Sequence, residues 1–181
     1  MKNKIRLLIT AGLCSAMVLG VTACGSEPKE IGSSQGAQAG TDSQTSSASG
    51  YVFTYDGTTI AADADMAPIA EALGEPANYY EEPSCAAQGI SKIYNYSDFE
   101  VYTYPDGDND LVQTVILKTD NVATPEGIDL SKEKSDIIAA YGEDYEEANG
   151  QMVYKKDGMK LCFIMDGDSI LSIEYNSGVL D

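Results

Sequence analysis

The chain has 181 residues, a formal net charge of −18, and neither His nor Trp. The absence of His excludes a His-based catalytic triad and a His-ligated zinc ion. Arg6 is the single arginine, so the chain after it has no arginine that could clamp a phosphate. These absences also exclude most kinds of nucleic-acid binding.

The first residues have the pattern of an export signal. Three cations within the first six residues precede an almost wholly apolar stretch, 7–21, which is too short for a stable membrane span. The stretch ends in Val21-Thr22-Ala23-Cys24, a junction that resembles the lipobox of bacterial lipoproteins. The resemblance implies that residues 1–23 are removed, that Cys24 carries a diacylglycerol, and that the protein is anchored on the extracytoplasmic face of the cell membrane. An ordinary secretory signal with a coincidental Cys is the alternative.

Ser, Gly and Thr dominate residues 25–50, which contain no aromatic residue. Such a segment buries too little apolar surface to become ordered, so residues 24–50 are predicted to be the lipidated Cys and a flexible tether. All twelve Tyr and all three Phe follow residue 50, which places the folded region at about 51–181. Removing the signal takes away three of the eleven cations and none of the 29 carboxylates, so the net charge becomes −21.

Two segments of the folded region have the pattern of short helices. Ile69–Gly74 and Ile137–Gly142 each carry apolar residues at i, i+1 and i+4, and each ends at a Gly suited to the left-handed position after a helix. A short strand pair around the Asp56-Gly57 turn is expected before the first helix.

The strands that follow the helices also occur twice. Phe99–Thr103 and Met159–Phe163 alternate like strands, and each continues into an Asp-Gly-Asp turn and a further strand. The common unit is helix, strand, strand, turn, strand, with repeats over 51–123 and 124–181 and an insertion in the first repeat within Glu75–Lys92. This pattern predicts an α+β class, in which each of two tandem repeats has a helix packed on an antiparallel sheet.

Two helix-plus-sheet copies in an exported chain are similar to the tandem architecture of β-lactamase inhibitory protein and of small outer-membrane assembly lipoproteins. Several segments also resemble a group of uncharacterised lipoproteins of anaerobic Gram-positive bacteria: Leu73-Gly74-Glu75-Pro76, Pro83-Ser84-Cys85-Ala86, Lys92-Ile93-Tyr94-Asn95-Tyr96, Tyr102-Thr103-Tyr104-Pro105 and Ala140-Tyr141-Gly142. The resemblance spans nearly all of residues 51–181. It implies the fold, but a fold of this kind hosts unrelated partners, and no contact residue can be transferred.

Asp106, Asp108 and Asp110 stand at alternate positions, as oxygen ligands of calcium do in an EF-hand loop. That loop requires Gly at its sixth position and Glu at its twelfth, where this chain has Leu111 and Leu117. We therefore expect an acidic hairpin turn and no metal or other cofactor.

Cys85 and Cys162 are the two thiols left in the folded region. A Cys nucleophile normally needs a basic neighbour such as His, which this chain lacks. Three interpretations stay open: a disulfide, two buried free thiols, or a redox pair. Export favours the disulfide, whereas an anaerobic source would weaken that inference.

No arrangement of residues marks a catalytic site. The many carboxylates include no pair whose environments would separate their pKa values, and Ser84 and Lys92 do not stand in a recognisable nucleophile setting. We therefore expect a protein that is not an enzyme.

Tyrosines give the best candidate site. If Phe99, Val101 and Thr103 face the helix, then Tyr102 and Tyr104 face away from it. Tyrosine suits protein and sugar surfaces because it combines a large apolar ring, a polar tip and few rotatable bonds. The alternative is that the rings pack between the two repeats. The complete candidate face consists of Tyr79, Tyr80, Tyr94, Tyr96, Tyr102 and Tyr104.

The function predicted from these patterns is a lipid-anchored extracytoplasmic binding module whose partner is a protein or a glycan. The charge argues against anionic partners, including nucleic acid, and the lipid provides the contact with the membrane. The alternatives are a cell-envelope hydrolase that uses carboxylates and a structural subunit of an envelope complex.

Overall fold

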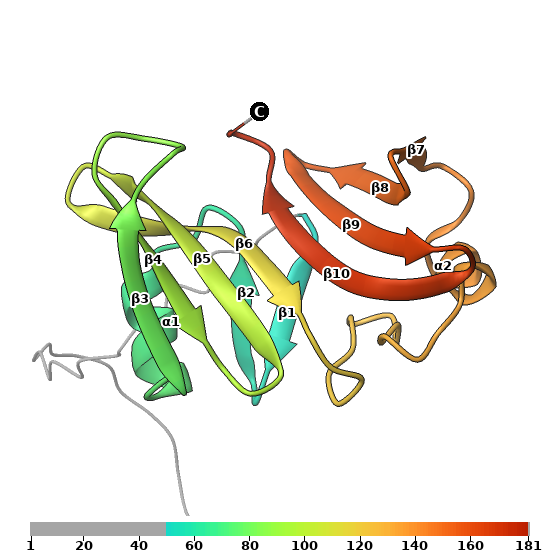
Figure 1. The fold of residues 1–181 in the computed structure, drawn as a ribbon, viewed down its shortest axis with the longest axis horizontal. Coiled ribbons are helices and arrows are strands. Elements are labelled where there is room, and N and C mark those ends of the chain that lie inside the picture. The colour runs from blue at the N-terminus through green and yellow to red at the C-terminus, as the bar shows by residue number, and fades with distance from the viewer. Residues whose placement is uncertain (1–49, 181) are drawn as a thin grey trace, which may run out of the picture. The chain divides into compact units, whose positions relative to one another are not determined.

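The structure is a computed structural model that describes residues 50–180. The signal, Cys24 and the tether up to residue 49 lie outside the described residues. Ten strands and two helices follow one another along the described chain (Figure 1): β1 (Val52–Tyr55), β2 (Thr58–Ala61), α1 (Met66–Leu73), β3 (Asn78–Pro83), β4 (Ile90–Asn95), β5 (Phe99–Asp106), β6 (Asn109–Leu117), α2 (Lys134–Tyr141), β7 (Glu146–Ala148), β8 (Gln151–Lys156), β9 (Met159–Asp166) and β10 (Ser169–Ser177).

Eight of these strands form one antiparallel sheet in the order β3-β4-β5-β6-β10-β9-β8-β7, and β1 pairs with β2 in a separate hairpin. Strands β3 to β6 come from the first half of the described chain and β7 to β10 from the second (Figure 1). The halves join where β10 pairs with β6, from Ile173 opposite Leu117 to Asn176 opposite Thr114. The sheet therefore continues from one half into the other.

Both helices have eight residues and begin and end at capping residues. Asp65 accepts a hydrogen bond from the backbone N–H two residues later (3.0 Å) at the start of α1, and Glu133 forms a capping box with Asp136 at the start of α2. Gly74 and Gly142 end the helices with φ values of 76° and 86°, which side chains with a Cβ rarely adopt. Within residues 50–180, no helix is long and apolar enough to cross a membrane.

The two helices and the β1–β2 hairpin cover one side of the sheet, which we call the closed face. Phe53 of β1 contacts Phe99 of β5 and Tyr175 of β10, with ring centroids 5.1 and 6.1 Å apart, so the hairpin packs against both halves. Ile137 of α2 is fully buried against the same core. The buried sheet residues of the closed face include Phe99, Val101, Val115, Leu117, Met152, Tyr154, Leu161, Phe163, Ile173 and Tyr175.

The predicted α+β class with two helix-on-sheet repeats is wrong. The chain is mostly β, and the two short helices lie against a single large sheet rather than each covering a sheet of its own. Glu75–Lys92, predicted to be an insertion in the first repeat, contains β3 and the start of β4, and β3 is longer than β7. The hairpin predicted at Asp56-Gly57 is present, as the turn between β1 and β2.

Candidate binding face on the sheet

The opposite side of the sheet, which we call the open face, carries half-buried side chains at its centre. In Figure 1, α1 and the β1–β2 hairpin lie behind the strands, so the open face is turned toward the viewer. Burial alternates along β6 and β10, with fully buried residues on the closed face and partly exposed residues between them. The central residues of the open face are Glu100, Tyr102, Thr114, Ile116, Cys162, Glu174 and Asn176.

Strand register arranges these side chains in two rows across the sheet. In one row Tyr102 lies opposite Thr114, which lies opposite Asn176. In the other row Ile116 lies between Glu100 and Glu174. Side chains directly opposite each other on antiparallel strands are in contact range, so both rows cross the junction between the two halves of the sheet.

Glu100 is the centre of a polar cluster on β4, β5 and the end of β6. Its Oε1 accepts hydrogen bonds from Asn95 Nδ2 (2.8 Å) and Lys118 Nζ (2.9 Å), and its Oε2 accepts one from the Tyr102 hydroxyl (3.0 Å). Lys118 Nζ also donates to Asn95 Oδ1 (2.6 Å). Burial and the bond to Glu100 raise the pKa of Tyr102. These contacts hold the Tyr102 ring and the Glu100 carboxylate in fixed positions.

A second polar cluster connects the two halves of the sheet. Thr114 Oγ1 of β6 donates to Asn176 Oδ1 of β10 (2.8 Å). The Asn176 amide then donates to Glu174 Oε2 (3.4 Å) and to Cys162 Sγ (3.5 Å) on the neighbouring strand. Residues far apart in sequence therefore orient one another at the middle of the open face.

Two open hollows lie over these clusters. One, of about 220 Å³, is lined by residues that include Tyr102, Ile116 and Glu174. The other, of about 370 Å³, lies toward β8 and β9 and is lined by residues that include Lys160 and Cys162. Both share Gln113, Thr114 and Asn176, so they adjoin along β6 and β10. The surface offers apolar patches, hydrogen-bonding groups and both signs of charge in one continuous area.

The six predicted tyrosines do not share one face. Tyr102 lies on the open face, and Tyr80, which is 55% exposed, stands in the same row through Ile93. Tyr79 and Tyr94 form an edge-to-face pair, with ring centroids 5.1 Å apart, on the other side of the sheet. The predicted face therefore divides between the two sides of β3 and β4.

Tyr104 and Tyr96 are core residues, which corrects their assignment to a binding face. Tyr104 is 7% exposed and its hydroxyl donates to Asp63 Oδ1 (2.9 Å), which also accepts from Ser177 Oγ (2.6 Å). Burial and the bond to Asp63 raise the pKa of Tyr104 to about 12. Tyr96 is 9% exposed and stacks on Phe99 at 4.9 Å. Both rings are thus packed inside the fold, Tyr96 against Phe99 of β5 and Tyr104 against the connection between β2 and α1.

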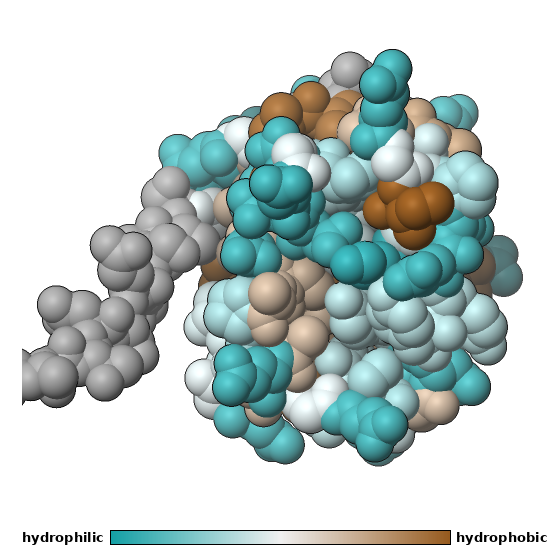
Figure 2. All heavy atoms as spheres, turned by 90° about the vertical axis from the view of Figure 1, so that its left-hand side faces the viewer, coloured by the Kyte–Doolittle hydropathy of each residue, from teal (hydrophilic) through white to brown (hydrophobic). Residues whose placement is uncertain are grey.

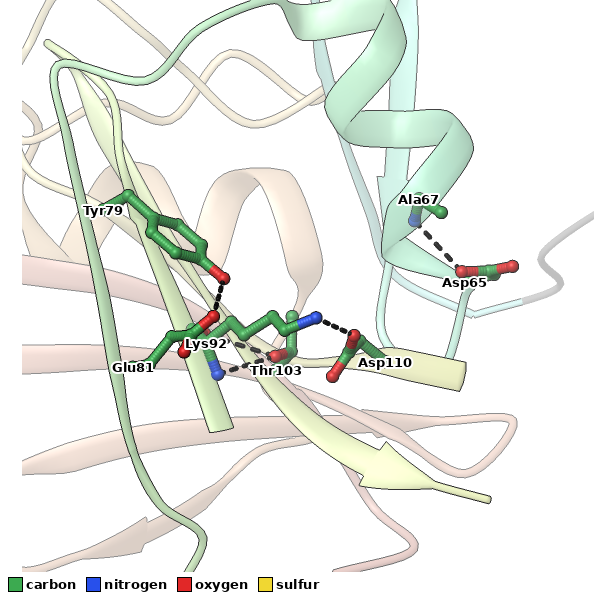
Figure 3. A network of polar contacts seen from close by, with 7 residues as sticks. All are labelled: Asp65, Ala67, Tyr79, Glu81, Lys92, Thr103 and Asp110. Carbon is green, nitrogen blue, oxygen red and sulfur yellow. Dashed lines mark hydrogen bonds and ion pairs between the residues drawn. The ribbon is translucent and has the colours of Figure 1, made fainter. Parts of the chain in front are cut away.

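A separate polar network lies beside α1 (Figure 3). The Tyr79 hydroxyl donates to Glu81 Oε1 (2.6 Å), and Lys92 Nζ pairs with Asp110 Oδ2 (2.5 Å). The hydrogen bond to Asp110 raises the pKa of Lys92. Thr103 Oγ1 accepts from the Lys92 backbone N–H (3.0 Å) and donates to its carbonyl (3.2 Å). The network fixes the positions of β4 to β6 relative to one another.

This network also shows what the three aspartates of the β5–β6 turn do. Asp110 faces Lys92, while Asp106 lies opposite Asn109 at the end of the hairpin and Asp108 is exposed in its turn. Among residues 50–180, no group of three His, Cys, Asp or Glu side chains is placed to hold a metal ion. The arrangement is that of an acidic hairpin turn.

Cys85 and Cys162 lie in different environments, and no disulfide joins them in the structure. Cys85 is exposed in the β3–β4 loop, and Cys162 is buried in β9. Four or five strand spacings separate them in the sheet, which corresponds to roughly 20 Å at about 4.8 Å per spacing. A disulfide requires Cα atoms less than about 7 Å apart, so the fold keeps these thiols from bonding to each other.

No protein-family model and no curated protein matches the chain. Among solved structures, the fold is similar to that of an extracellular protein containing an SCP domain from Bacillus anthracis str. Ames, with a TM-score of 0.51 and 13% sequence identity. The similarity covers 68% of this chain and 47% of that one, so the chain spans about half the length of the protein it resembles. At this identity the likeness shows the fold alone, and the resemblance to known lipoproteins stays a prediction.

Proposed function

We propose that this protein is a lipid-anchored binding module on the extracytoplasmic side of the membrane, and that its open face holds a protein or a glycan. One observation carries the proposal. No other element of residues 50–180 covers the centre of this side of the sheet, where a hydrogen bond to Glu100 holds the Tyr102 ring and hydrogen bonds to Thr114 and Cys162 hold the Asn176 side chain. Preorganised aromatic and polar groups reduce the entropic cost of binding.

The carboxylates of the open face suit binding better than hydrolysis. Glu100 and Glu174 lie on either side of Ile116, as a catalytic pair could. Both oxygens of Glu100, however, already accept hydrogen bonds from Asn95, Lys118 and Tyr102. A carboxylate engaged in this way fixes its neighbours and is poorly placed to exchange a proton with a substrate.

The lipid anchor and the location rest on the junction at Cys24. A protein with eight cations and 29 carboxylates after processing favours neutral or cationic partners over anionic polymers. The structural neighbour is itself extracellular, which is in keeping with this location. Replacing Cys24 with Ala should leave protein without lipid, and mass spectrometry of the membrane and soluble fractions tests this. Unchanged membrane partition with no lipid on the mature wild-type protein would contradict the anchor.

Photo-crosslinking in the producing cell tests the open face. A photoreactive residue at Gln113, which lines both hollows, should give a discrete adduct, while the same residue at the exposed Glu71 of α1 should not. Adding Tyr102→Ala should remove most of the adduct, because an aromatic anchor contributes more than about 2 kcal/mol to binding. Tyr79→Ala, on the other side of the sheet, is the matched control.

Digestion of the adduct identifies the class of partner. Sensitivity to a protease indicates a protein, and sensitivity to a glycosidase indicates a glycan. Equal adducts from Gln113 and Glu71, or an adduct unaffected by Tyr102→Ala, would refute binding at the open face.

A further inference from the structure

The two ends of the sheet differ in what they offer to another strand. At one end, β7 has three residues. At the other end, β3 has six residues, Asn78–Pro83, and all six are exposed. Within the described residues, no strand pairs with the outer side of β3. The β3 edge therefore presents a longer row of backbone hydrogen-bonding groups than the β7 edge.

The backbone of β3 is regular. Its pairing with β4 runs without a bulge from Asn78 opposite Asn95 to Pro83 opposite Ile90. In an antiparallel ladder, alternate residues direct their N–H and C=O groups away from the neighbouring strand. These outward groups are at the spacing that an added strand needs, and Pro83 ends the row because it has no N–H.

The side chains of β3 specify the kind of strand that fits. Tyr79 and Glu81 lie on one side, and Tyr80 and Glu82 lie on the other, so each side presents a ring followed by a carboxylate. Tyr79 is held by its contact with Tyr94 and its bond to Glu81. An added strand with cations near the carboxylates and apolar residues near the rings would match both sides.

The surface around the β3 edge is polar enough to suit a charged partner. Figure 2 shows that this side of the molecule is largely hydrophilic, with apolar residues scattered rather than gathered in one patch. The net charge of −18 opposes pairing of two copies through their β3 strands, because the carboxylates would face each other. An extended cationic segment of another protein would not meet this repulsion, because its charges are opposite to those of the β3 carboxylates.

We propose that β3 binds an extended, cationic segment of a partner protein, which adds to the sheet as a further strand. Backbone hydrogen bonds along β3 provide the affinity. Glu81 and Glu82 select cations, and Tyr79 and Tyr80 contact the apolar residues between them. Tyr80 and Glu82 lie on the same side of the sheet as Tyr102. The outer backbone edge of β3 is nevertheless separated from Tyr102 on β5 by β4, so an added strand leaves the centre of the open face accessible.

A short peptide tests the proposal on the full chain. The probe is the dye-labelled, end-capped hexapeptide Thr-Lys-Lys-Val-Val-Thr, which in an antiparallel pairing places Lys opposite Glu81 and Glu82 and Val opposite Tyr79 and Tyr80. Its binding is read by fluorescence anisotropy. The control peptide has the same sequence with two consecutive amides N-methylated, which blocks hydrogen bonding along both of its edges. We expect the N-methylated peptide to bind at least tenfold more weakly, although its charge is unchanged.

Variants of the chain locate the site. Glu82→Lys should weaken binding at least tenfold, whereas Glu143→Lys, an identical change of charge in an exposed loop, should change it less than twofold. Tyr102→Ala should have no effect, which separates this edge from the open face. Hydrogen exchange should show slower exchange of the β3 amides when the peptide is bound.

Other outcomes overturn the proposal. Equal binding of the two peptides would indicate charge attraction without strand addition. Equal effects of Glu82→Lys and Glu143→Lys would place the peptide elsewhere. Outward amides of β3 that are already protected in the free monomer would show that the chain's own residues occupy the edge. Concentration-dependent dimers that protect the same amides would show that a second copy occupies it.

Discussion

Two buried tyrosines allow a matched test of hydrogen bonding in the core. Tyr154 is 2% exposed and its hydroxyl donates to the carbonyl of Gly142 (2.8 Å), the residue that ends α2. Tyr175 is 1% exposed, and its hydroxyl has no hydrogen-bond partner among residues 50–180. Changing each to Phe removes the same atom from nearly the same degree of burial. We expect the two substitutions to have opposite effects on stability.

The magnitudes follow from what each hydroxyl does. Tyr154→Phe removes one hydrogen bond and leaves the Gly142 carbonyl without that donor, so it should lower the free energy of unfolding by about 1–2 kcal/mol. A buried hydroxyl without a partner costs about 1–3 kcal/mol, and Tyr175→Phe removes this cost at the expense of a small void. It should therefore raise the free energy of unfolding by about 1 kcal/mol, a difference of about 2–3 kcal/mol between the two variants.

Urea denaturation followed by far-UV circular dichroism measures both variants against the wild type. Similar m-values, the slopes of the unfolding free energy against urea concentration, would show that a variant changes stability and not the surface exposed on unfolding. Tyr96→Phe provides an intermediate case, because the Tyr96 hydroxyl makes the corresponding contact with the Gly74 carbonyl at 3.4 Å. A loss of stability in Tyr175→Phe as large as in Tyr154→Phe would refute the reasoning, since it would mean that both hydroxyls are equally well bonded.

Three further predictions concern packing, pH and the thiols. Gly178→Ala should lower the free energy of unfolding by about 1–3 kcal/mol, because a Cβ there would lie 2.2 Å from the Gly158 carbonyl oxygen; an unchanged urea midpoint would contradict this close approach. Stability should fall as the pH rises from about 10 toward 12, because burial raises the pKa of Tyr154 to about 12 in the folded state, whereas the unfolded chain ionises at about pH 10. Urea midpoints at several pH values test this, and Tyr154→Phe should make the decline shallower. Cys85 should react with a maleimide in the native protein and Cys162 only after unfolding; an intact mass corresponding to an oxidised pair would contradict the separation of the thiols.

Short-range signals in the sequence predicted the local elements. The apolar stripes ending at Gly74 and Gly142 lie in α1 and α2, and Ile69 and Ile137 are buried as a stripe facing the core should be. The Asp56-Gly57 pair forms the first hairpin turn. Each of these features depends on residues within one or two turns of chain, which is why composition and spacing are sufficient to find them.

The features that sequence reasoning missed depend on long-range pairing. No local pattern indicates that β10 pairs with β6, yet this pairing turns two expected sheets into one. Alternation placed Tyr102 and Tyr104 on one exposed side. Tyr104 is nevertheless buried, because the connection between β2 and α1 runs beside β6 and brings Asp63 to its hydroxyl. The contact between Thr114 and Asn176 could not be predicted for a related reason. Alternation along a strand indicates which face a side chain lies on, but not which residue of another strand lies opposite it.

We expect the open face to lose polar side chains with little effect on folding, so that the proposed binding can be tested separately from stability. Lys118 and Glu100 are partly exposed, and such an ion pair contributes about 0–1 kcal/mol. Buried rings such as Tyr154, in contrast, contribute several kcal/mol through packing alone. The polar cluster around Glu100 is therefore expected to contribute little to the free energy of folding. Its members are Asn95, Glu100, Tyr102 and Lys118. Under the proposed function, the fixed geometry that this cluster gives to the exposed side of the sheet is what a partner would recognise.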